Sequence, residues 1–423
     1  MKKRIQRIAI LGYFGVGNLG DEAVVGILLE NLRRQWTDAD IFAICLNPED
    51  TEKQHGIRAF PIRRLSRTRL DGNGPTFLEG LLTNKDSSGA ISFLKRWLYR
   101  IFVVGPREIV FLLKSLQRIR GLDMMIVGGS GQLIDVEGGP WNHPYNHFKW
   151  AVLSRLVGAK FVLFSVGAGP IETRMGKFFI RHSLSMSDYC SFRDSHSRDL
   201  IRKIGVRHRD SVFPDQAFGL AIESYLEQSP KASVVAVAPI AYADPRHWYE
   251  PDADAYQEYL SKMTDFVKWL ISMDFTVVLF HTQVGGDDVV VSELIHRVQD
   301  EIHGRLPTSI IEHKVQWYSD SLKAISMADC VIASRFHAVL FSILLSRPVI
   351  GLSYHQKIND MMASLKYGDY VISISNFDVE TLKKKFLTIQ AKKQAITELA
   401  KPLLIEYREQ LRNQYRTVLS DQP

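Results

Sequence analysis

The feature that most restricts the fold of this chain is a series of short Val-, Ile- and Leu-rich runs, each followed by a loop and a helical pattern. These runs lack the alternation of half-exposed strands and are typical of parallel strands covered on both faces. One series comprises residues 4–13, 41–46, 124–127 and 161–166. A second comprises residues 234–239, 276–280, 330–333 and 349–353. We therefore expect an α/β protein with two doubly wound, Rossmann-like domains.

A polar, proline-containing stretch near residue 230 separates the two series. We expect an N-terminal domain over 1–225, a C-terminal domain over 230–383, and a charged helix over 384–423 that packs back on the first domain. Residues 62–121 depart from this alternation of apolar runs and helical patterns. Arg and Lys interleave there with Phe, Leu and Trp, as in FLKRWLYRIF. This insertion is predicted either to pack on the first domain or to lie on an anionic membrane surface.

Composition and hydropathy indicate the cellular compartment in which we expect the protein. No stretch approaches the roughly 18 apolar residues of a transmembrane helix, and the basic N-terminus runs into a glycine loop rather than a signal-peptide core. The three cysteines lie in apolar runs without metal-ligand spacing, which favours a reducing compartment. The net charge of +7 is compatible with acidic small molecules, an anionic membrane surface or nucleic acid. No nucleic-acid-binding motif accompanies it. We expect a cytoplasmic protein, with possible peripheral contact at the inner membrane, that does not bind nucleic acid.

The first loop, residues 12–22, reads GYFGVGNLGDE and contains a G-x-G-x-x-G pattern that starts at Gly15 and Gly17. Asp21 and Glu22 fall in the first turn of the following helix, where they favour the helix dipole but would repel a pyrophosphate. A nicotinamide or flavin site is therefore disfavoured, and a tight strand-to-helix turn is the simpler alternative.

Five motifs in order carry a resemblance to a known family. GYFGVGNLGDEA followed by a leucine-rich helix resembles the opening motif of the polysaccharide pyruvyl transferases. MMIVGGSGQLID, FSVGAGPIET, SFRDSHSRDLIRKIGV and SRFHAVLFSILLSRPVIGLSYHQK resemble the later ones, so the likeness spans about residues 8–360. It implies a two-domain fold like that of GT-B glycosyltransferases, with the active site in the cleft between the domains.

The resemblance also implies a reaction. Such an enzyme transfers the enolpyruvyl group of phosphoenolpyruvate to a sugar of a polysaccharide or its lipid-linked precursor, as a ketal, and releases phosphate. Its partners would be phosphoenolpyruvate and a sugar or lipid-linked oligosaccharide acceptor, with no metal and no further cofactor. The acceptor would lie on the N-terminal domain and phosphoenolpyruvate on the C-terminal domain.

The catalytic candidates cluster in the last motif. Ser334 is expected to cap a helix, which would place Arg335 and His337 at its positive N-terminus, where anions bind. His337 is the predicted general acid, because a histidine has an ordinary pKa of about 6.5 and carries a proton near neutral pH. Lys357 follows the next strand and is predicted to bind the same anion as Arg335.

Further candidates come from the first domain. Arg193 has a planar fork that can grip a carboxylate or phosphate, although a surface pair with Asp194 is the alternative. FPD at 213–215 matches the segment that follows in the family, with Asp215 as the candidate. The remaining predicted substrate contacts are Gly15, Gly17, Asn18, Asp21, Gly129, Ser130 and His281. Of these, the Asn18 amide suits sugar hydroxyls because it both donates and accepts.

His147 resembles an active-site histidine of the family and, like Asp21, is a candidate to take the proton of the attacking hydroxyl. His143 lies four residues before it, which invites a zinc site. The glutamate of an H-E-x-x-H motif is missing, and Pro144 argues against a helix there, so a metal site is disfavoured.

Two other functions fit parts of the pattern. A glycosyltransferase that uses a nucleotide sugar would share the two-domain frame and the cationic helix start. A non-catalytic partner in polysaccharide assembly would use the basic insertion at 62–121 as its contact.

Overall fold

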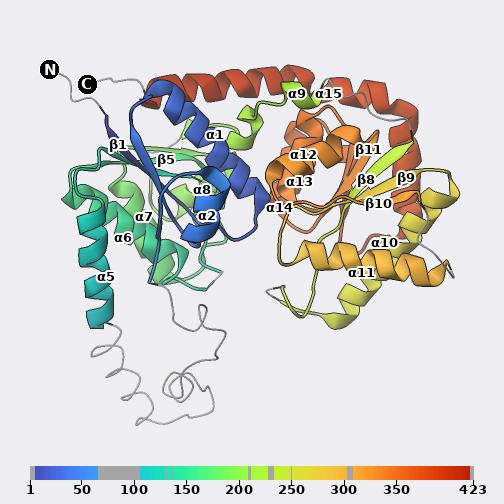
Figure 1. Cartoon of the computed structure of the whole chain (residues 1–423), viewed down its shortest axis with the longest axis horizontal. Helices are drawn as coiled ribbons and strands as arrows, with labels where there is room; N and C mark the ends of the chain where they lie inside the picture. The colour runs from blue at the N-terminus through green and yellow to red at the C-terminus, as the bar shows by residue number, and fades with distance from the viewer. Residues whose placement is uncertain are drawn as a thin grey trace, which may run out of the picture.

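The computed structural model describes residues 5–64, 105–128, 131–136, 138–207, 211–226, 233–248, 250–302 and 308–419. These residues form two parallel β-sheets, each covered by helices, and one long helix spans both halves (Figure 1). No helix in these ranges is both long and apolar enough to cross a membrane. The two helix-covered parallel sheets confirm the expected α/β fold with two doubly wound domains.

The first sheet has seven strands in the order β3-β2-β1-β4-β5-β6-β7. Its strands are β1 Arg7–Leu11, β2 Asp40–Cys45, β3 Ala59–Pro61, β4 Met124–Val127, β5 Lys160–Val166, β6 Tyr189–Phe192 and β7 Ser211–Val212. Its helices are α1 Leu19–Gln35, α2 Pro48–His55, α5 Gly105–Arg118, α6 His143–Leu156, α7 Arg174–Ser185, α8 Ser195–Lys203, η3 Gln216–Gly219 and α9 Glu223–Leu226. Strands β1, β2, β4 and β5 are almost wholly buried, as their continuous apolar runs predict.

The second sheet has six strands in the order β10-β9-β8-β11-β12-β13. They are β8 Val234–Ala238, β9 Thr276–Leu279, β10 Ile310–Glu312, β11 Cys330–Ala333, β12 Val349–Ser353 and β13 Val371–Ser373. The helices are α10 Ala253–Ser272, α11 Asp287–Glu301, α12 Tyr318–Met327, α13 Phe336–Leu344, α14 Gln356–Ser364 and η4 Gly368–Tyr370.

The strand orders determine where ligands are expected. The order reverses between β1 and β4 in the first sheet and between β8 and β11 in the second. Open α/β sheets bind ligands beyond the carboxyl ends of the strands at such reversals. The glycine loop follows β1, and the segment that carries Arg335 and His337 follows β11. Both predicted motifs therefore lie at ligand-binding positions of their sheets.

The last helix, α15 Val379–Leu419, crosses from the second domain back to the first (Figure 1). Gln414 near its end bonds Ser191 at 2.6 Å and Gln216 at 2.9 Å, both in the first domain. The expected crossover helix is thus present. It begins at Val379 rather than at 384, because the side chain of Asp378 accepts from the amide of Thr381 and starts the helix earlier.

Two local expectations differ from the structure. A helix does form around the histidine pair, because α6 begins at His143 and Pro144 lies in its first turn. Proline is tolerated there, since the first helical N–H groups have no partner within the helix. The edge strands β3, β7, β10 and β13 were not predicted, because runs of two or three residues carry too little pattern. The segment FLKRWLYRIF lies outside the described residues.

Candidate active site

The glycine loop of the first domain docks on the second domain. The amide of Leu19 donates to the carbonyl of Thr282 at 3.1 Å, and the amide of Val284 donates to the carbonyl of Gly17 at 2.9 Å. Asn18 and Gln283 lie opposite each other in this short antiparallel bridge. The loop therefore closes the cleft between the two sheets.

Glycine is required in this loop for two reasons. Gly17 has a φ of +79°, and a Cβ there would lie 2.7 Å from the carbonyl oxygen of Val284. Gly15 has a φ of +83°, and its amide donates to the buried carboxylate of Glu22 at 2.7 Å. These contacts use backbone that a dinucleotide would need, so they favour the tight-turn interpretation of the motif.

Asn18 and Asp21 hold the start of α1. The side-chain oxygen of Asn18 accepts from the amide of Gly20 at 3.2 Å, and its amide group donates to Asp21 at 2.8 Å. Asn18 is thus the helix cap, with both ends of its side chain engaged. Binding of acceptor hydroxyls by these two residues stays a prediction.

His337 lies in the first turn of α13, buried against α1. A Cβ on Gly20 would lie 1.8 Å from its Nδ1, so only glycine allows the ring to fit against that helix. Its Nε2 lies 3.9 Å from Oδ1 of Asp215, a residue of the first domain. Among the described residues, neither this Nε2 nor Oδ2 of Asp215 has a hydrogen-bond partner. The pair therefore keeps hydrogen-bonding capacity at the domain interface.

Asp215 is a buried carboxylate held in place by its neighbours. Its Oδ1 accepts from the amide of Ala217 at 2.9 Å, which starts the short helix η3. Its Oδ2 lies 3.7 Å from a guanidinium nitrogen of Arg193. Burial acts to raise the pKa of Asp215, but the His337 ring and the Arg193 cation outweigh it, so the pKa lies below its ordinary value. The carboxylate therefore carries its negative charge beside His337.

Arg193 directly follows β6 and forms the pair with Asp194 that was the alternative to an anion contact, and the anion contact itself stays a prediction. Its Nε donates to Asp194 at 3.2 Å, and Asp194 caps α8. Its guanidinium also lies over the ring of Phe336 in the second domain, 5.0 Å from the ring centre. Arg193 therefore pairs with the cap and also reaches across the cleft.

Arg193 and Lys357 line one cavity of about 350 Å³ between the domains, which we call the charged cavity. Its other charged lining residues are Asp194, Arg198, Asp215 and Asp360. Burial, together with the cations Lys357 and Arg193, lowers the pKa of nearby His355 to about 4. The cavity is thus a place where positive groups of both domains converge. No sequence pattern indicated that Arg198 and Asp360 would line this cavity.

Arg335 is paired with a buried acid. Its Nε and one terminal nitrogen donate to Asp287 at 2.8 and 2.9 Å. Burial acts to lower the pKa of Arg335, but the Asp287 carboxylate raises it above the ordinary value. The expected capping role of Ser334 is wrong, because α13 starts one residue later with Arg335 at the cap position. A substrate contact of Arg335 stays a prediction.

His281 follows β9 near this pair. Its carbonyl accepts from Ser321 at 3.2 Å, and burial lowers the pKa of its ring despite the nearby acids Asp288 and Asp287. Among the described residues, its Nδ1 has no partner. Of the other predicted contacts, Gly129 and Ser130 lie outside the described residues.

His147 is fully buried in α6 of the first domain. Its Nε2 lies 3.1 Å from the carbonyl of Gln132, which can only accept, so this nitrogen carries the proton and Nδ1 carries the lone pair. His143 bonds the same carbonyl at 3.2 Å. Burial lowers the pKa of His147 to about 4, so its ring is neutral at pH 7. A neutral imidazole with a lone pair fits the predicted role of a base, which stays a prediction.

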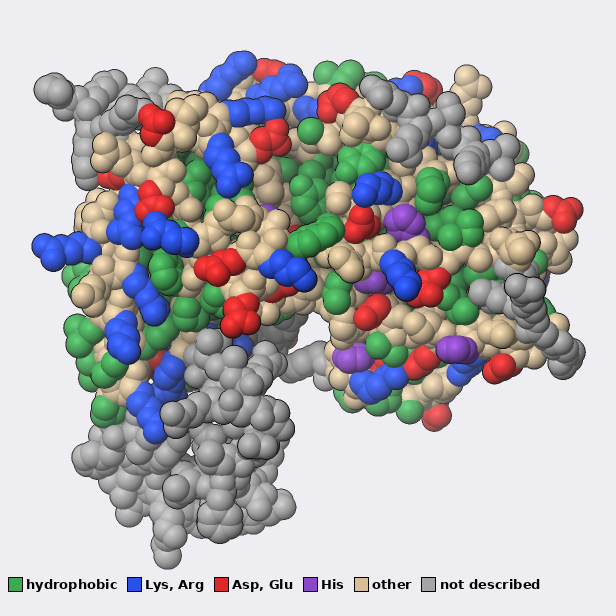
Figure 2. Space-filling model, viewed as in Figure 1, with side chains coloured by type: hydrophobic (Ala, Val, Ile, Leu, Met, Phe, Trp, Pro, Cys, Tyr) green, Lys and Arg blue, Asp and Glu red, His purple; other side chains and the backbone are tan. Residues whose placement is uncertain are grey.

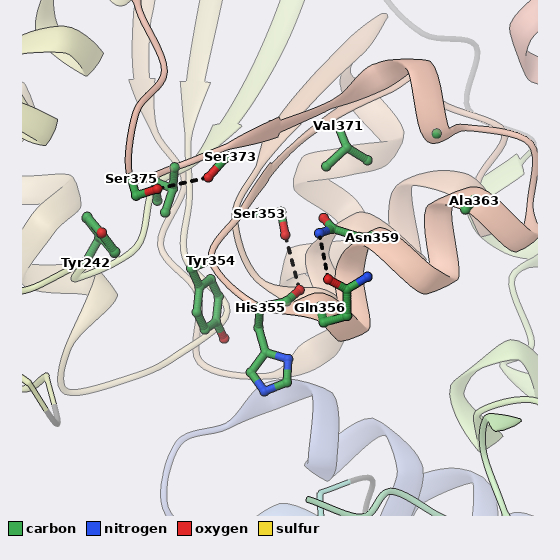
Figure 3. Close-up of a pocket in the computed structure, with 12 residues that line it drawn as sticks. Tyr242, Ser353, Tyr354, His355, Gln356, Asn359, Ala363, Val371, Ser373 and Ser375 are labelled. Atoms are coloured by element: carbon green, nitrogen blue, oxygen red, sulfur yellow. Dashed lines mark hydrogen bonds between the residues drawn. The ribbon is translucent and has the colours of Figure 1, made fainter. Parts of the chain in front are cut away.

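A second cavity, of about 520 Å³, lies on the C-terminal domain and is called here the neutral cavity (Figure 3). Its lining residues are Tyr242, Ser353, Tyr354, His355, Gln356, Asn359, Ala363, Gly368, Val371, Ser373, Ile374 and Ser375. Tyr354, one of these, interacts with the guanidinium of Arg335. The neutral cavity therefore adjoins the site that contains Arg335.

Two Rossmann-like domains that close a charged site between them define a GT-B-like protein. Solved structures support this class. HepE from Anabaena in complex with UDP has a TM-score of 0.53 at 11% identity, covering 98% of this chain and 100% of that chain. A glycosyltransferase from Rickettsia africae has a TM-score of 0.55 at 11% identity, covering 99% of each chain. The UDP-GlcNAc 2-epimerase from Neisseria meningitidis bound to UDP-GlcNAc has a TM-score of 0.52 at 9% identity, covering 93% and 94%.

A comparison with curated proteins gave no match. The sequence profile of the polysaccharide pyruvyl transferase family, however, matches residues 18–356. The chain therefore belongs to the polysaccharide pyruvyl transferase family, as its ordered motifs indicated.

Proposed function

We propose that this protein transfers the enolpyruvyl group of phosphoenolpyruvate to a sugar of a polysaccharide or its lipid-linked precursor, forms a pyruvate ketal, and releases phosphate. The observation that carries the proposal is the convergence of Arg193 and Lys357 from opposite domains in the charged cavity, beside the His337–Asp215 pair. Phosphoenolpyruvate carries a phosphate and a carboxylate, and cationic side chains suit both groups. Arg335 at the start of α13 is the third proposed cation.

In the proposed reaction His337 gives a proton to the methylene carbon of phosphoenolpyruvate, which becomes a methyl group and leaves C2 electrophilic. A sugar hydroxyl attacks C2, phosphate leaves, and a second hydroxyl of the sugar closes the ring. The two hydroxyls lose two protons in all. One replaces the proton that His337 gave, and the other leaves with phosphate.

Asp215 supports this role of His337. Its buried carboxylate lies 3.9 Å from Nε2 and is held by the amide of Ala217, so it can fix the orientation of the ring. Asp215 acts through His337 and is therefore a positioning residue. For the attacking hydroxyl, His147 and Asp21 are the proposed bases.

Because the proposed acceptor includes a lipid-linked precursor, we also propose that the protein contacts the inner membrane. Helix α5 exposes Ile109, Val110 and Leu113, and Figure 2 shows Lys and Arg side chains interleaved with hydrophobic ones over this helix. Such a surface suits an anionic bilayer that carries a lipid-linked acceptor. Sedimentation with anionic vesicles, but not with zwitterionic ones, is the expected result, and equal recovery with both would contradict it.

The second candidate function is glycosyl transfer from a nucleotide sugar. It is favoured by the fold, since solved structures of similar architecture include a glycosyltransferase and proteins bound to UDP or UDP-GlcNAc. These likenesses lie at 9–11% identity and concern the fold alone.

The test is phosphate release from phosphoenolpyruvate with a panel of saccharide acceptors. We expect release that depends on acceptor and falls at least about 100-fold in His337→Ala, since acid catalysis contributes 10²–10⁴-fold. Unchanged turnover in folded His337→Ala would exclude His337 as the acid. Release of a nucleoside diphosphate from a nucleotide sugar, with none from phosphoenolpyruvate, would establish the second candidate instead.

A further inference from the structure

The two cavities beside α14 differ in chemistry. Acidic and basic side chains line the charged cavity, whereas no Asp, Glu, Lys or Arg is found among the described residues that line the neutral cavity. The latter offers five hydroxyl groups and two side-chain amides, from Tyr242, Ser353, Tyr354, Gln356, Asn359, Ser373 and Ser375. The one titratable imidazole, His355, is neutral at pH 7 because burial lowers its pKa to about 4. A charged ligand would find no counter-ion on these walls.

We propose that the neutral cavity binds an uncharged sugar ring. Hydroxyl and amide groups both donate and accept, so they match the ring hydroxyls of a sugar, which do the same. A cavity with a few convergent polar groups on an apolar wall is the usual form of a small-molecule site. The volume of about 520 Å³ is large enough for one sugar ring with part of its neighbour.

Aromatic rings supply the apolar wall. Trp248 lies edge-on to Tyr242, with ring centres 5.4 Å apart, and edge-on to Tyr354 at 5.3 Å. Figure 3 shows Tyr242 and Tyr354 on one side of the cavity and Gln356 and Asn359 on the other. A sugar ring placed between them would meet aromatic surface on its C–H face and polar groups at its edge.

The polar groups are incompletely used within the protein. Oδ1 of Asn359 is buried and, among the described residues, lacks a partner. Its amide group makes only a long bond of 3.4 Å to Gln356. Ser373 and Ser375 bond each other at 3.0 Å, and each hydroxyl keeps a further lone pair. A ligand with hydroxyl groups would satisfy these positions, and buried unpaired acceptors are otherwise costly.

The position of the neutral cavity next to the charged cavity indicates what it binds, an inference that rests on the proposed function. Residues 353–357 run between the two cavities, with Tyr354 toward Arg335 and Lys357 lining the charged cavity. A ring in the neutral cavity would lie beside the bound anion. Two sources supply such a ring: a sugar unit of the extended acceptor, next to the unit that reacts, and the ribose of a nucleotide.

The test is saturation-transfer NMR on the full chain with two sets of probes. One set contains methyl glycosides and short neutral oligosaccharides, and the other contains uridine and UDP. We expect saturation of ring protons, with a Kd about five-fold weaker in Asn359→Ala, because a hydrogen bond to the ring is lost. Asn413→Ala, the same truncation on the exposed face of α15, should bind like the wild type.

The outcomes separate the sources. Binding of glycosides alone assigns the cavity to the acceptor, and binding of uridine assigns it to a ribose. No ring saturation by either set, or saturation that Asn359→Ala leaves unchanged, would overturn the inference. Ser375→Ala, at an exposed position, provides a second variant if Asn359→Ala does not fold.

Phosphoenolpyruvate binding is measured on the same samples. If phosphoenolpyruvate binds and sugars do not, only the neutral cavity is wrongly assigned. If sugars bind and phosphoenolpyruvate does not, the proposed donor fails while the neutral cavity stands.

Discussion

His337 and Asp215 come from different domains, so the proposed acid is complete only where the two domains meet. Sequence motifs predicted His337 as the acid and marked Asp215 as a candidate, but not their contact. A pair separated by more than a hundred residues is joined by the packing of two sheets, which no local pattern encodes. The bidentate pairing of Arg335 with Asp287 is likewise visible only in the structure.

Replacement of Asp215 tests whether it positions His337. Asp215→Asn removes the carboxylate that lies 3.9 Å from Nε2 of His337, so the ring loses the group proposed to position it. We expect kcat to fall at least about 10-fold while KM for phosphoenolpyruvate changes little, because the proposed acid is no longer held in place. Asp360→Asn, which changes a carboxylate of the same cavity without a contact to His337, is the control. Equal kcat values for the two variants would contradict the assigned role.

Gly20 tests how closely the domains approach. A Cβ at this position would lie 1.8 Å from Nδ1 of His337, so Gly20→Ala must displace the ring or open the cleft. We expect kcat to fall about 100-fold, the cost of an ångström-scale misplacement. Gly219→Ala, whose added Cβ would meet only ordinary contacts beginning at 3.6 Å, should retain activity. Equal activity of the two variants would show that the observed closure is not the active arrangement.

At the scale of elements, long apolar runs were predicted well and short ones were not. Strands β4, β11 and β12 have the expected bounds, because buried parallel strands leave a continuous apolar signal. Edge strands such as β7 are too short for that. Helix α6 includes Pro144, against the expectation from sequence, because the first helical turn accepts proline.

Helix α15 joins the domains through a buried polar network. Gln414 donates to Ser191 and accepts from Gln216 and Ser165, all in the first domain. Gln414→Ala removes its three hydrogen bonds to this buried network, and we expect the free energy of unfolding to fall by about 2–3 kcal/mol. Urea denaturation measures this, with the exposed Asn413→Ala as control. A loss below about 0.5 kcal/mol would mean that the network does not hold α15.

At the scale of the whole molecule, His147 makes stability depend on pH. Its pKa is about 4 in the folded protein, below the ordinary value near 6.5, so the unfolded chain binds the proton first. Stability is therefore expected to decline as pH falls from about 6.5 to about 4, by roughly 3 kcal/mol from this residue.

Urea denaturation across this pH range checks the effect. His147→Gln, which keeps a donor for the Gln132 carbonyl, should flatten the decline. His296→Gln, at an exposed position of α11, should leave it unchanged. A decline as steep in His147→Gln as in the wild type would show that the folded protein does not hold this ring neutral.

The proposed function requires phosphoenolpyruvate to bind in the charged cavity, and thermal unfolding with this ligand tests that binding most directly. At 100 times its dissociation constant a ligand stabilises the fold by about 2.7 kcal/mol. We expect a rise in Tm with phosphoenolpyruvate that disappears in Arg193→Ala and Lys357→Ala. A rise with a nucleotide sugar, and none with phosphoenolpyruvate, would contradict the proposed function.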